Sequence, residues 1–213
     1  MSSAIDNYIE AHTTEEPDLL KKLNRETHLR VVNPRMLSGH VQGRFLKMIC
    51  RMIQPSCVLE LGTFTGYSAL CLAEGMPEDG ILHTIEINDE LEEFTQEFFA
   101  QSPHGKKIKQ HIGNALEIIP TLIESFDLVF MDADKREYLS YYHAIFDNVR
   151  PGGYIIADNT LWDGKVVENT TANDKQTLAV MAFNDFIVKD ERVEIVLLPL
   201  RDGLSIIRKN ELY

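Results

Sequence analysis

The most constraining feature of this 213-residue sequence is a regular alternation that begins after Pro55. Short apolar runs of strand length alternate with longer stretches in which apolar residues recur at helical spacing. The runs occupy residues 57–61, 81–85, 108–112, 126–131 and 154–157. The stretches between them include residues 67–73, 89–101, 115–124 and 136–148. Nearly continuous apolar strands joined by helices are typical of a parallel sheet covered on both faces, so the pattern predicts a doubly wound α/β fold.

The C-terminal end departs from this pattern. Residues 193–198 and 204–208 have strand character and are separated only by residues 199–203, which predicts an antiparallel hairpin. A chain of this length suits one domain. We therefore expect a single domain over residues 1–213, with an N-terminal helical segment (1–53) and an α/β core (54–213).

The N-terminal segment is predicted to contain three helices. Ile5, Tyr8 and Ile9 recur at helical spacing in the first of them. Thr14 is the expected N-cap of the second helix, because two glutamates and a proline follow it in what would be the first turn. Ser38 is the expected N-cap of the third, which should end before Pro55.

Composition and charge exclude several classes of function. No uncharged apolar stretch approaches the ~20 residues of a membrane-spanning helix, and the N-terminus lacks the regions of a secretory signal. We therefore expect a cytoplasmic protein with no membrane partner. The three cysteines and seven histidines follow no zinc-binding spacing. The net charge of −12 disfavours binding to nucleic-acid phosphates.

The first two predicted strands end in residues that suit an adenosine-containing ligand. Residues 60–68 form a glycine-bearing turn into a helix, with glycines at 62 and 66 rather than at dinucleotide-binding spacing, which opposes an NAD-dependent oxidoreductase. Glu86 ends the second strand, twenty positions after Gly66, where a carboxylate could accept hydrogen bonds from ribose. Asn114 follows the third strand, either as a helix N-cap or in a turn that borders an adenine ring.

Oxygen donors follow the next two strands. Asp132 ends the fourth strand, and Asp158 and Asn159 end the fifth. Two carboxylates and one amide oxygen, without sulfur or imidazole, suit a hard cation such as Mg²⁺. Each aspartate could instead cap the following helix, but the three residues together are less plausible as caps.

The sequence resembles the cation-dependent, S-adenosylmethionine-dependent O-methyltransferases, which include catechol and caffeoyl-coenzyme A O-methyltransferases and bacterial relatives. The resemblance covers nearly the whole chain after about Pro34. The matching motifs are Val58-Leu59-Glu60-Leu61-Gly62, Gly66-Tyr67-Ser68, Ile85-Glu86-Ile87-Asn88, Met131-Asp132-Ala133-Asp134-Lys135, Asp158-Asn159-Thr160-Leu161-Trp162 and Asp202-Gly203. It implies a class I methyltransferase domain with a Rossmann-like, mostly parallel seven-stranded sheet whose last strand is antiparallel.

The resemblance also implies roles for individual residues. The expected cofactor-binding residues are Glu60, Gly62 and Ser68 at the methionine part of S-adenosylmethionine, Glu86 at the ribose, Ala115 at the adenine edge, and also Met36, Leu37, Phe64 and Asp132. Asp132, Asp158 and Asn159 match the family's metal ligands, with Mg²⁺ expected first and Mn²⁺ or Ca²⁺ as alternatives. Lys135 matches its proposed catalytic base, so Lys135 and Asp132 form the expected catalytic pair. Residues 162–174 correspond to a variable insertion, and Trp162 could stack on an acceptor or only cover the wall.

These expectations combine into one function. The chain should transfer a methyl group from S-adenosylmethionine to a hydroxyl of a small catechol-type aromatic acceptor, using a divalent cation that holds two adjacent hydroxyls. Methylation of 5-hydroxyuridine in tRNA is the alternative, which the negative charge weakly opposes. A non-catalytic adenosyl-ligand-binding protein would not need Lys135 and the oxygen donors. The apolar N-terminal helices and the resemblance lead us to expect a homodimer.

Overall fold

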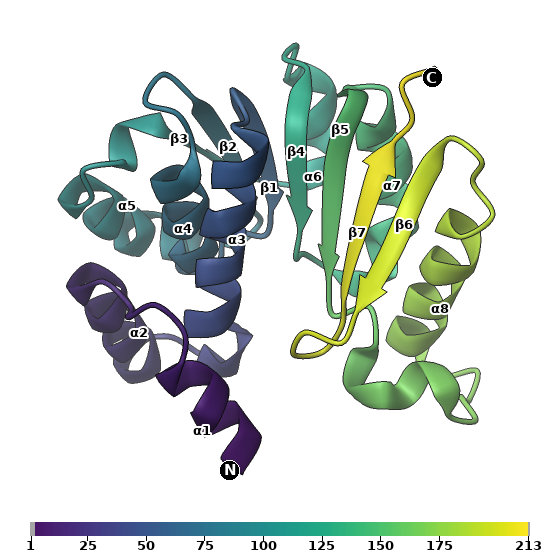
Figure 1. The fold of residues 1–213 in the computed structure, drawn as a ribbon, viewed down its shortest axis with the longest axis horizontal. Coiled ribbons are helices and arrows are strands. Elements are labelled where there is room, and N and C mark those ends of the chain that lie inside the picture. Colours follow the sequence, from purple (N-terminus) through teal and green to yellow (C-terminus); the bar gives the residue numbers. More distant parts are fainter. Residues whose placement is uncertain (1–2, 213) are drawn as a thin grey trace.

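The structure, a computed structural model, describes residues 3–212 and contains one mixed sheet of seven strands in the order β3-β2-β1-β4-β5-β7-β6 (Figure 1). The strands are β1 (Cys57–Leu61), β2 (Ile81–Glu86), β3 (Ile108–Ile112), β4 (Phe126–Met131), β5 (Val149–Asp158), β6 (Val193–Leu198) and β7 (Leu204–Lys209). The first five strands pair in parallel, whereas β7 is antiparallel to both β5 and β6. The predicted doubly wound sheet with an antiparallel last strand is confirmed.

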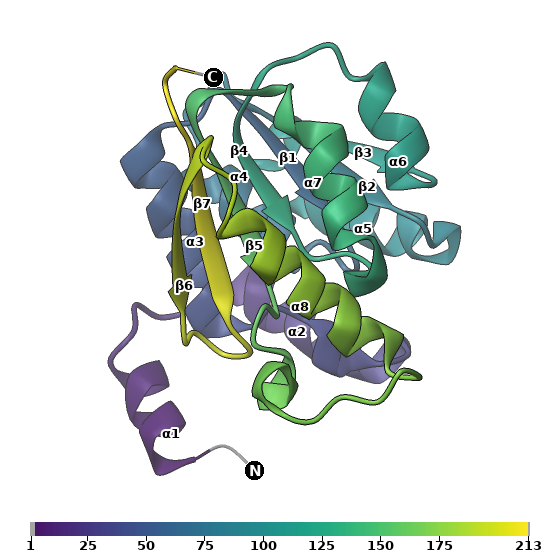
Figure 2. The same cartoon turned by 90° about the vertical axis from the view of Figure 1, so that its right-hand side faces the viewer.

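Helices cover both faces of this sheet (Figures 1 and 2). They are α1 (Ala4–Ala11), α2 (Asp18–Arg30), α3 (His40–Ile53), α4 (Tyr67–Gly75), α5 (Glu92–Gln101), α6 (Ala115–Ile118), α7 (Tyr138–Phe146) and α8 (Lys175–Ile187). Helices α2 to α5 bury their apolar side chains on one face, and α6 to α8 on the other. Successive strand residues alternate between these two cores: Leu128 and Phe130 face the first, and Val129 and Met131 the second. Burial on both faces explains why the strands are nearly uniformly apolar.

Two predicted helix caps are wrong. Helix α2 begins at Asp18 with Pro17 as its N-cap, and Thr14 lies outside it, because the residue before a proline is disfavoured in helical conformation. Helix α3 begins after Gly39, whose φ of +78° suits glycine, and not after Ser38. The Ser38 carbonyl instead accepts a hydrogen bond from Arg201, so an interaction distant in sequence overrides the local capping signal.

Two boundaries also differ from the prediction. The helix expected over residues 115–124 ends at Ile118 and continues only as a short 3-10 turn, Ile119–Thr121, in which Pro120 lacks the N–H that a regular helix would use. Strand β5 begins at Val149, five residues earlier than expected, with an irregular register where it joins β4.

Helix α8 was not predicted. Asp174 caps it by accepting a hydrogen bond from the Thr177 amide at 3.1 Å, and Phe183 packs edge-on against Tyr138 of α7. The helix is the crossover between β5 and β6 and covers the outer part of one face. Among residues 3–212, no helix combines the length and apolar character that a membrane crossing requires.

Candidate functional site

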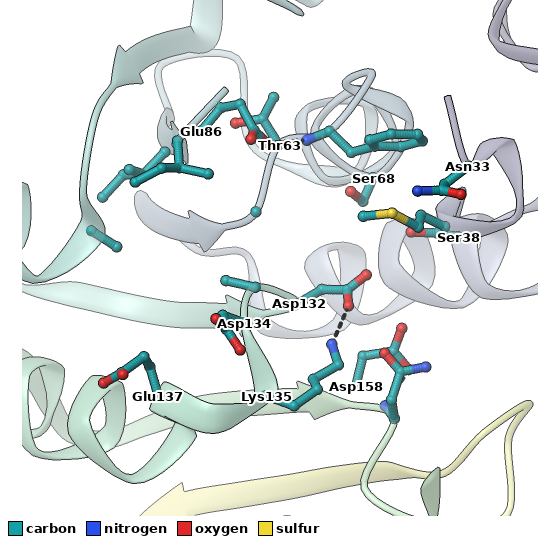
Figure 3. A pocket seen from close by; sticks show the side chains of 18 of the residues that line it. Asn33, Ser38, Thr63, Ser68, Glu86, Asp132, Asp134, Lys135, Glu137 and Asp158 are labelled. Carbon is teal, nitrogen blue, oxygen red and sulfur yellow. Dashed lines mark hydrogen bonds and ion pairs between the residues drawn. The ribbon is translucent and has the colours of Figure 1, made fainter. Parts of the chain in front are cut away.

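A cavity of about 1130 Å³ opens at the carboxyl edge of the sheet (Figure 3). Its wall consists of the turns that follow β1 to β5, together with residues 33–38 and three side chains from the C-terminal third: Trp162, Gln176 and Arg201. The carboxyl edge of a doubly wound sheet is the usual place for a ligand.

The turn after β1 forms one side of this cavity. Gly62 has a φ of +95°, and a Cβ there would lie 2.3 Å from the carbonyl oxygen of Asp132, so only glycine fits. Phe64 and Gly66 also have positive φ values, which tightens the turn into α4. Ser68, in the first turn of α4, is buried and lines the cavity.

Glu60 lies behind the cavity wall, not on it, and is fully buried. The Thr84 hydroxyl donates to its Oε2, whereas its Oε1 has no hydrogen-bond partner within residues 3–212. Burial raises the pKa of the Glu60 carboxyl to about 8. A buried carboxylate oxygen without a partner is unfavourable unless a cationic group binds it. The ammonium group of a bound amino acid moiety would be such a partner.

Glu86 and the turn after β3 form the neighbouring wall. Glu86 Oε2 accepts from the Phe64 amide at 2.7 Å and Oε1 from the Asn88 amide at 2.9 Å. Each carboxylate oxygen retains a lone pair for a ligand hydroxyl. Asn114 caps α6 by accepting from the Leu116 amide at 2.9 Å, which confirms the N-cap interpretation, and Ala115 in the same turn lines the cavity.

Asp132 and Lys135 lie together on the opposite wall (Figure 3). Lys135 Nζ donates to Asp132 Oδ1 at 2.7 Å and to the Tyr138 hydroxyl at 2.8 Å, and Lys135 is only 7% exposed. The Tyr138 hydroxyl lies 3.1 Å from the Met131 carbonyl and 3.0 Å from the Asp158 carbonyl, so it touches the ends of β4 and β5.

The charges around Asp132 oppose one another. Burial raises the pKa of the Asp132 carboxyl to about 6, the Lys135 charge lowers it, and the negative charge of Asp158 raises it. A buried Asp132 carboxyl beside the negative charge of Asp158 provides a place for an added positive charge.

Asp158 and Asn159 complete the set of oxygen donors. Asp158 is 2% exposed; its Oδ1 accepts from the Asn159 amide at 2.8 Å and its Oδ2 from Gln42 Nε2 at 2.8 Å. Asn159 has a φ of +56°, and its side-chain nitrogen lies 3.5 Å from Asp202 Oδ2, so its carbonyl oxygen is the donor left for a ligand.

These residues fit a divalent cation by their chemistry. Within residues 3–212, no group of three or more His, Cys, Asp and Glu side chains is arranged to hold a metal ion. The set here consists of two carboxylates and one amide, all oxygen donors, as hard cations prefer.

The structure brings most of the predicted residues to one cavity. The predicted site residues in its wall are Met36, Leu37, Gly62, Phe64, Ser68, Glu86, Ala115, Asp132, Lys135, Asp158 and Asn159. Glu60 alone of the predicted set stays behind the wall. Sequence reasoning missed Gln42, Tyr138 and Arg201; of these, only Arg201 had a signal, its place beside the Asp202-Gly203 motif.

Solved structures that are similar to this one include methyltransferases. The chain is similar to a SAH-bound methyltransferase of Podospora anserina, with a TM-score of 0.88 over 97% of this chain and 94% of that chain, at 27% identity. It is also similar to the O-methyltransferase TomG of Streptomyces achromogenes in complex with SAM, with a TM-score of 0.89 over 98% and 96% of the two chains, at 28% identity.

The sequence comparisons identify the family of methyltransferases to which the chain is similar. The O-methyltransferase family profile matches residues 10–210. Caffeoyl-CoA O-methyltransferase 2 of Zea mays is 36% identical over 205 residues, which are 91% of this chain and 77% of that protein. This chain belongs to the O-methyltransferase family.

The buried Glu60 carboxyl predicts a pH dependence of stability. Its folded-state pKa of about 8 lies above the usual value, so its contribution to the free energy of unfolding is fully present below about pH 4.5 and is lost as pH rises through about 8. Glu60→Gln removes this ionisation. Urea unfolding of the ligand-free variant should therefore show a smaller loss of stability between about pH 5 and pH 8 than the wild type. Glu93→Gln, at an exposed position of α5, controls for the loss of one charge. Equal slopes in wild type and Glu60→Gln would contradict the burial argument.

Proposed function

We propose that this enzyme transfers a methyl group from S-adenosylmethionine to a hydroxyl oxygen of a small catechol-type acceptor, with a divalent cation at the site. The observation that carries the proposal is the arrangement of Asp132, Asp158, Asn159 and Lys135 on one wall of the cavity, opposite the turn after β1. The SAM complex of the TomG relative supports the methyl donor. The caffeoyl-CoA O-methyltransferase relatives support a hydroxylated aromatic acceptor.

The donor would occupy the side of the cavity that β1, β2 and β3 form. Glu86 would accept hydrogen bonds from the ribose hydroxyls, and Ala115 would border the adenine. The unpaired Oε1 of Glu60 and the hydroxyl of Ser68 would bind the methionine part, at Gly62. Met36, Leu37 and Phe64 would cover the bound donor.

Asp132, Asp158 and Asn159 would hold the cation, with Mg²⁺ expected first. A bound divalent cation supplies a positive charge that fixes two adjacent hydroxyls and stabilises negative charge on the oxygen to be methylated. The protein's own part is to hold three oxygen donors in place and to position the acceptor close to the donor, which removes much of the entropic barrier.

Lys135 would accept the proton of the reacting hydroxyl. In the neutral form its Nζ can donate both of its hydrogens, to Asp132 and to Tyr138, and keep its lone pair for that proton. Tyr138 therefore acts as a positioning residue, because its hydroxyl ties Lys135 to the ends of β4 and β5.

The observations favour a small acceptor over tRNA. The net charge of −12 opposes contact with a polyanion, and the cavity volume of about 1130 Å³ is near the size of small-molecule sites. A non-catalytic adenosyl-ligand-binding protein would have no use for a buried lysine beside paired carboxylates.

Glu86 tests the donor assignment. Glu86→Ala should weaken binding of S-adenosylhomocysteine about tenfold or more, because charge-assisted hydrogen bonds to the ribose are lost. Glu86→Gln should have an intermediate effect, since one acceptor oxygen remains. Titration calorimetry measures both, with the exposed Glu90→Ala on the following turn as control. Wild-type affinity in a folded Glu86→Ala variant would rule out the ribose assignment.

The cation requirement tests the proposed reaction. Chelator should abolish turnover of a vicinal aromatic diol, and Mg²⁺ or Mn²⁺ should restore it. Asp158→Ala should resist restoration, while Asp147→Ala, at the exposed end of α7, should behave as wild type. A matched mono-phenol should react far more slowly, because only the diol can be fixed through two oxygens. Full activity after chelation, measured with labelled donor, would refute the cation role.

Lys135 separates proton transfer from positioning. Lys135→Met should lower diol turnover by roughly 10²–10⁴-fold at neutral pH, with partial rescue at higher pH where the acceptor ionises unaided. Mn²⁺ and donor affinities should not weaken, because the change removes no oxygen donor. The exposed Lys109→Met is the control for charge. Normal turnover of Lys135→Met at neutral pH would show that Lys135 is not the proton acceptor.

A further inference from the structure

Arg201 lies in the turn between β6 and β7, lines the cavity and contacts the N-terminal segment. Its Nη2 donates to the Leu37 carbonyl at 3.2 Å. Its Nη1 donates to the Ser38 carbonyl and, at 2.6 Å, to Gln42 Oε1. One planar guanidinium thus joins two backbone carbonyls and a side-chain amide through two nitrogens that are held at a fixed separation, whereas an ammonium group has only one nitrogen.

Gln42 connects Arg201 to the proposed cation site by hydrogen bonds on both sides of its amide. It is 1% exposed, and its Nε2 donates to Asp158 Oδ2 at 2.8 Å while its Oε1 accepts from Arg201. The two neighbours fix the orientation of the amide, because a flipped amide would set its oxygen against a carboxylate and its NH₂ against a cation. The second oxygen of Asp158 is held by the Asn159 amide, so both carboxylate oxygens are oriented.

Residues 33–38 make few hydrogen bonds to the rest of the protein apart from those with Arg201. Within residues 3–212, every hydrogen bond that links residues 33–38 to another element comes from Arg201. The Met36 and Leu37 amides bond only inside the segment, to Asn33 and Pro34. Leu37 and Ser38 line the cavity, and Figure 3 shows Ser38 on the side next to Ser68.

We propose that Arg201 is a positioning residue that closes residues 33–38 over the donor pocket and, through Gln42, holds the Asp158 carboxylate in place, so that closure of the pocket and the geometry of the cation site are coupled. The inference rests on the proposed function for the role of Asp158. It extends that function by connecting two ligand sites through one side chain of the hairpin turn.

The test uses substitutions that keep the charge. Arg201→Lys retains the positive charge but replaces the two donor nitrogens of the planar guanidinium with one. Gln42→Met removes the link to Asp158 while leaving the Leu37 and Ser38 contacts of Arg201 available. Arg208→Lys is the matched control, because Arg208 lies on β7 of the same hairpin and pairs with Glu194 and Glu211 at the surface.

Hydrogen–deuterium exchange of the ligand-free protein tests closure without any ligand. Arg201→Lys should raise exchange in peptides that cover residues 33–39 about tenfold, with exchange of β1 unchanged and Arg208→Lys as wild type. Gln42→Met should leave this exchange within about twofold of wild type. Wild-type exchange over residues 33–39 in Arg201→Lys would overturn the proposal.

Affinities for Mn²⁺ and for S-adenosylhomocysteine test the coupling. Arg201→Lys should weaken both about tenfold, and Gln42→Met should weaken Mn²⁺ binding while changing donor binding less. Unchanged Mn²⁺ affinity in Gln42→Met would overturn the link to Asp158. A wild-type protein that binds no Mn²⁺ would refute the cation site of the proposed function and with it the coupling, whereas the exchange result would still decide closure by Arg201.

Discussion

The close approach of Gly62 to the Asp132 carbonyl is the constraint on which the site depends. The Asp132 amide donates to the Leu61 carbonyl at 2.8 Å, so β1 and β4 remain paired to their last residues and then turn apart. A side chain at position 62 would force the strand ends away from each other. Because both turns begin at this contact, the residues that follow β1 and those that follow β4 meet across one cavity.

The cavity concentrates acidic groups where water is scarce. Glu60 and Asp158 are almost completely buried, and burial raises the pKa of both Glu60 and Asp132. Buried acidic groups of this kind lower the stability of a fold. The stability of this region therefore depends on hydrogen bonds from Lys135, Gln42 and Thr84. Each of these residues donates to one of the three carboxylates.

Features of the structure that depend on neighbouring residues in the sequence were predictable, and features that depend on distant residues were not. The strands were predictable because both of their faces are buried. The residues of the cavity wall were predictable because the carboxyl ends of the strands meet at one edge of the sheet. Thr14 and Ser38 are not the caps because Pro17 and Gly39 take those positions. Gln42 was not predictable, since a glutamine in the first turn of an amphipathic helix has no local feature that distinguishes it from a solvated one. Its role depends on contacts 116 and 159 residues away.

The two sides of the cavity differ in how they are built. One side consists of turns that are anchored directly by paired strands. The other receives Trp162 from the long connection between β5 and α8, and Gln176 from the first turn of α8. That connection contributes no strand pair, and Trp162 and Asp163 adopt left-handed backbone conformations that loops tolerate. Replacement of this connection would alter the shape and polarity of one wall while every strand register stayed the same. The architecture is therefore modular, because an evolving lineage or a protein engineer could exchange this one wall and leave the turns that follow β1 to β4 intact.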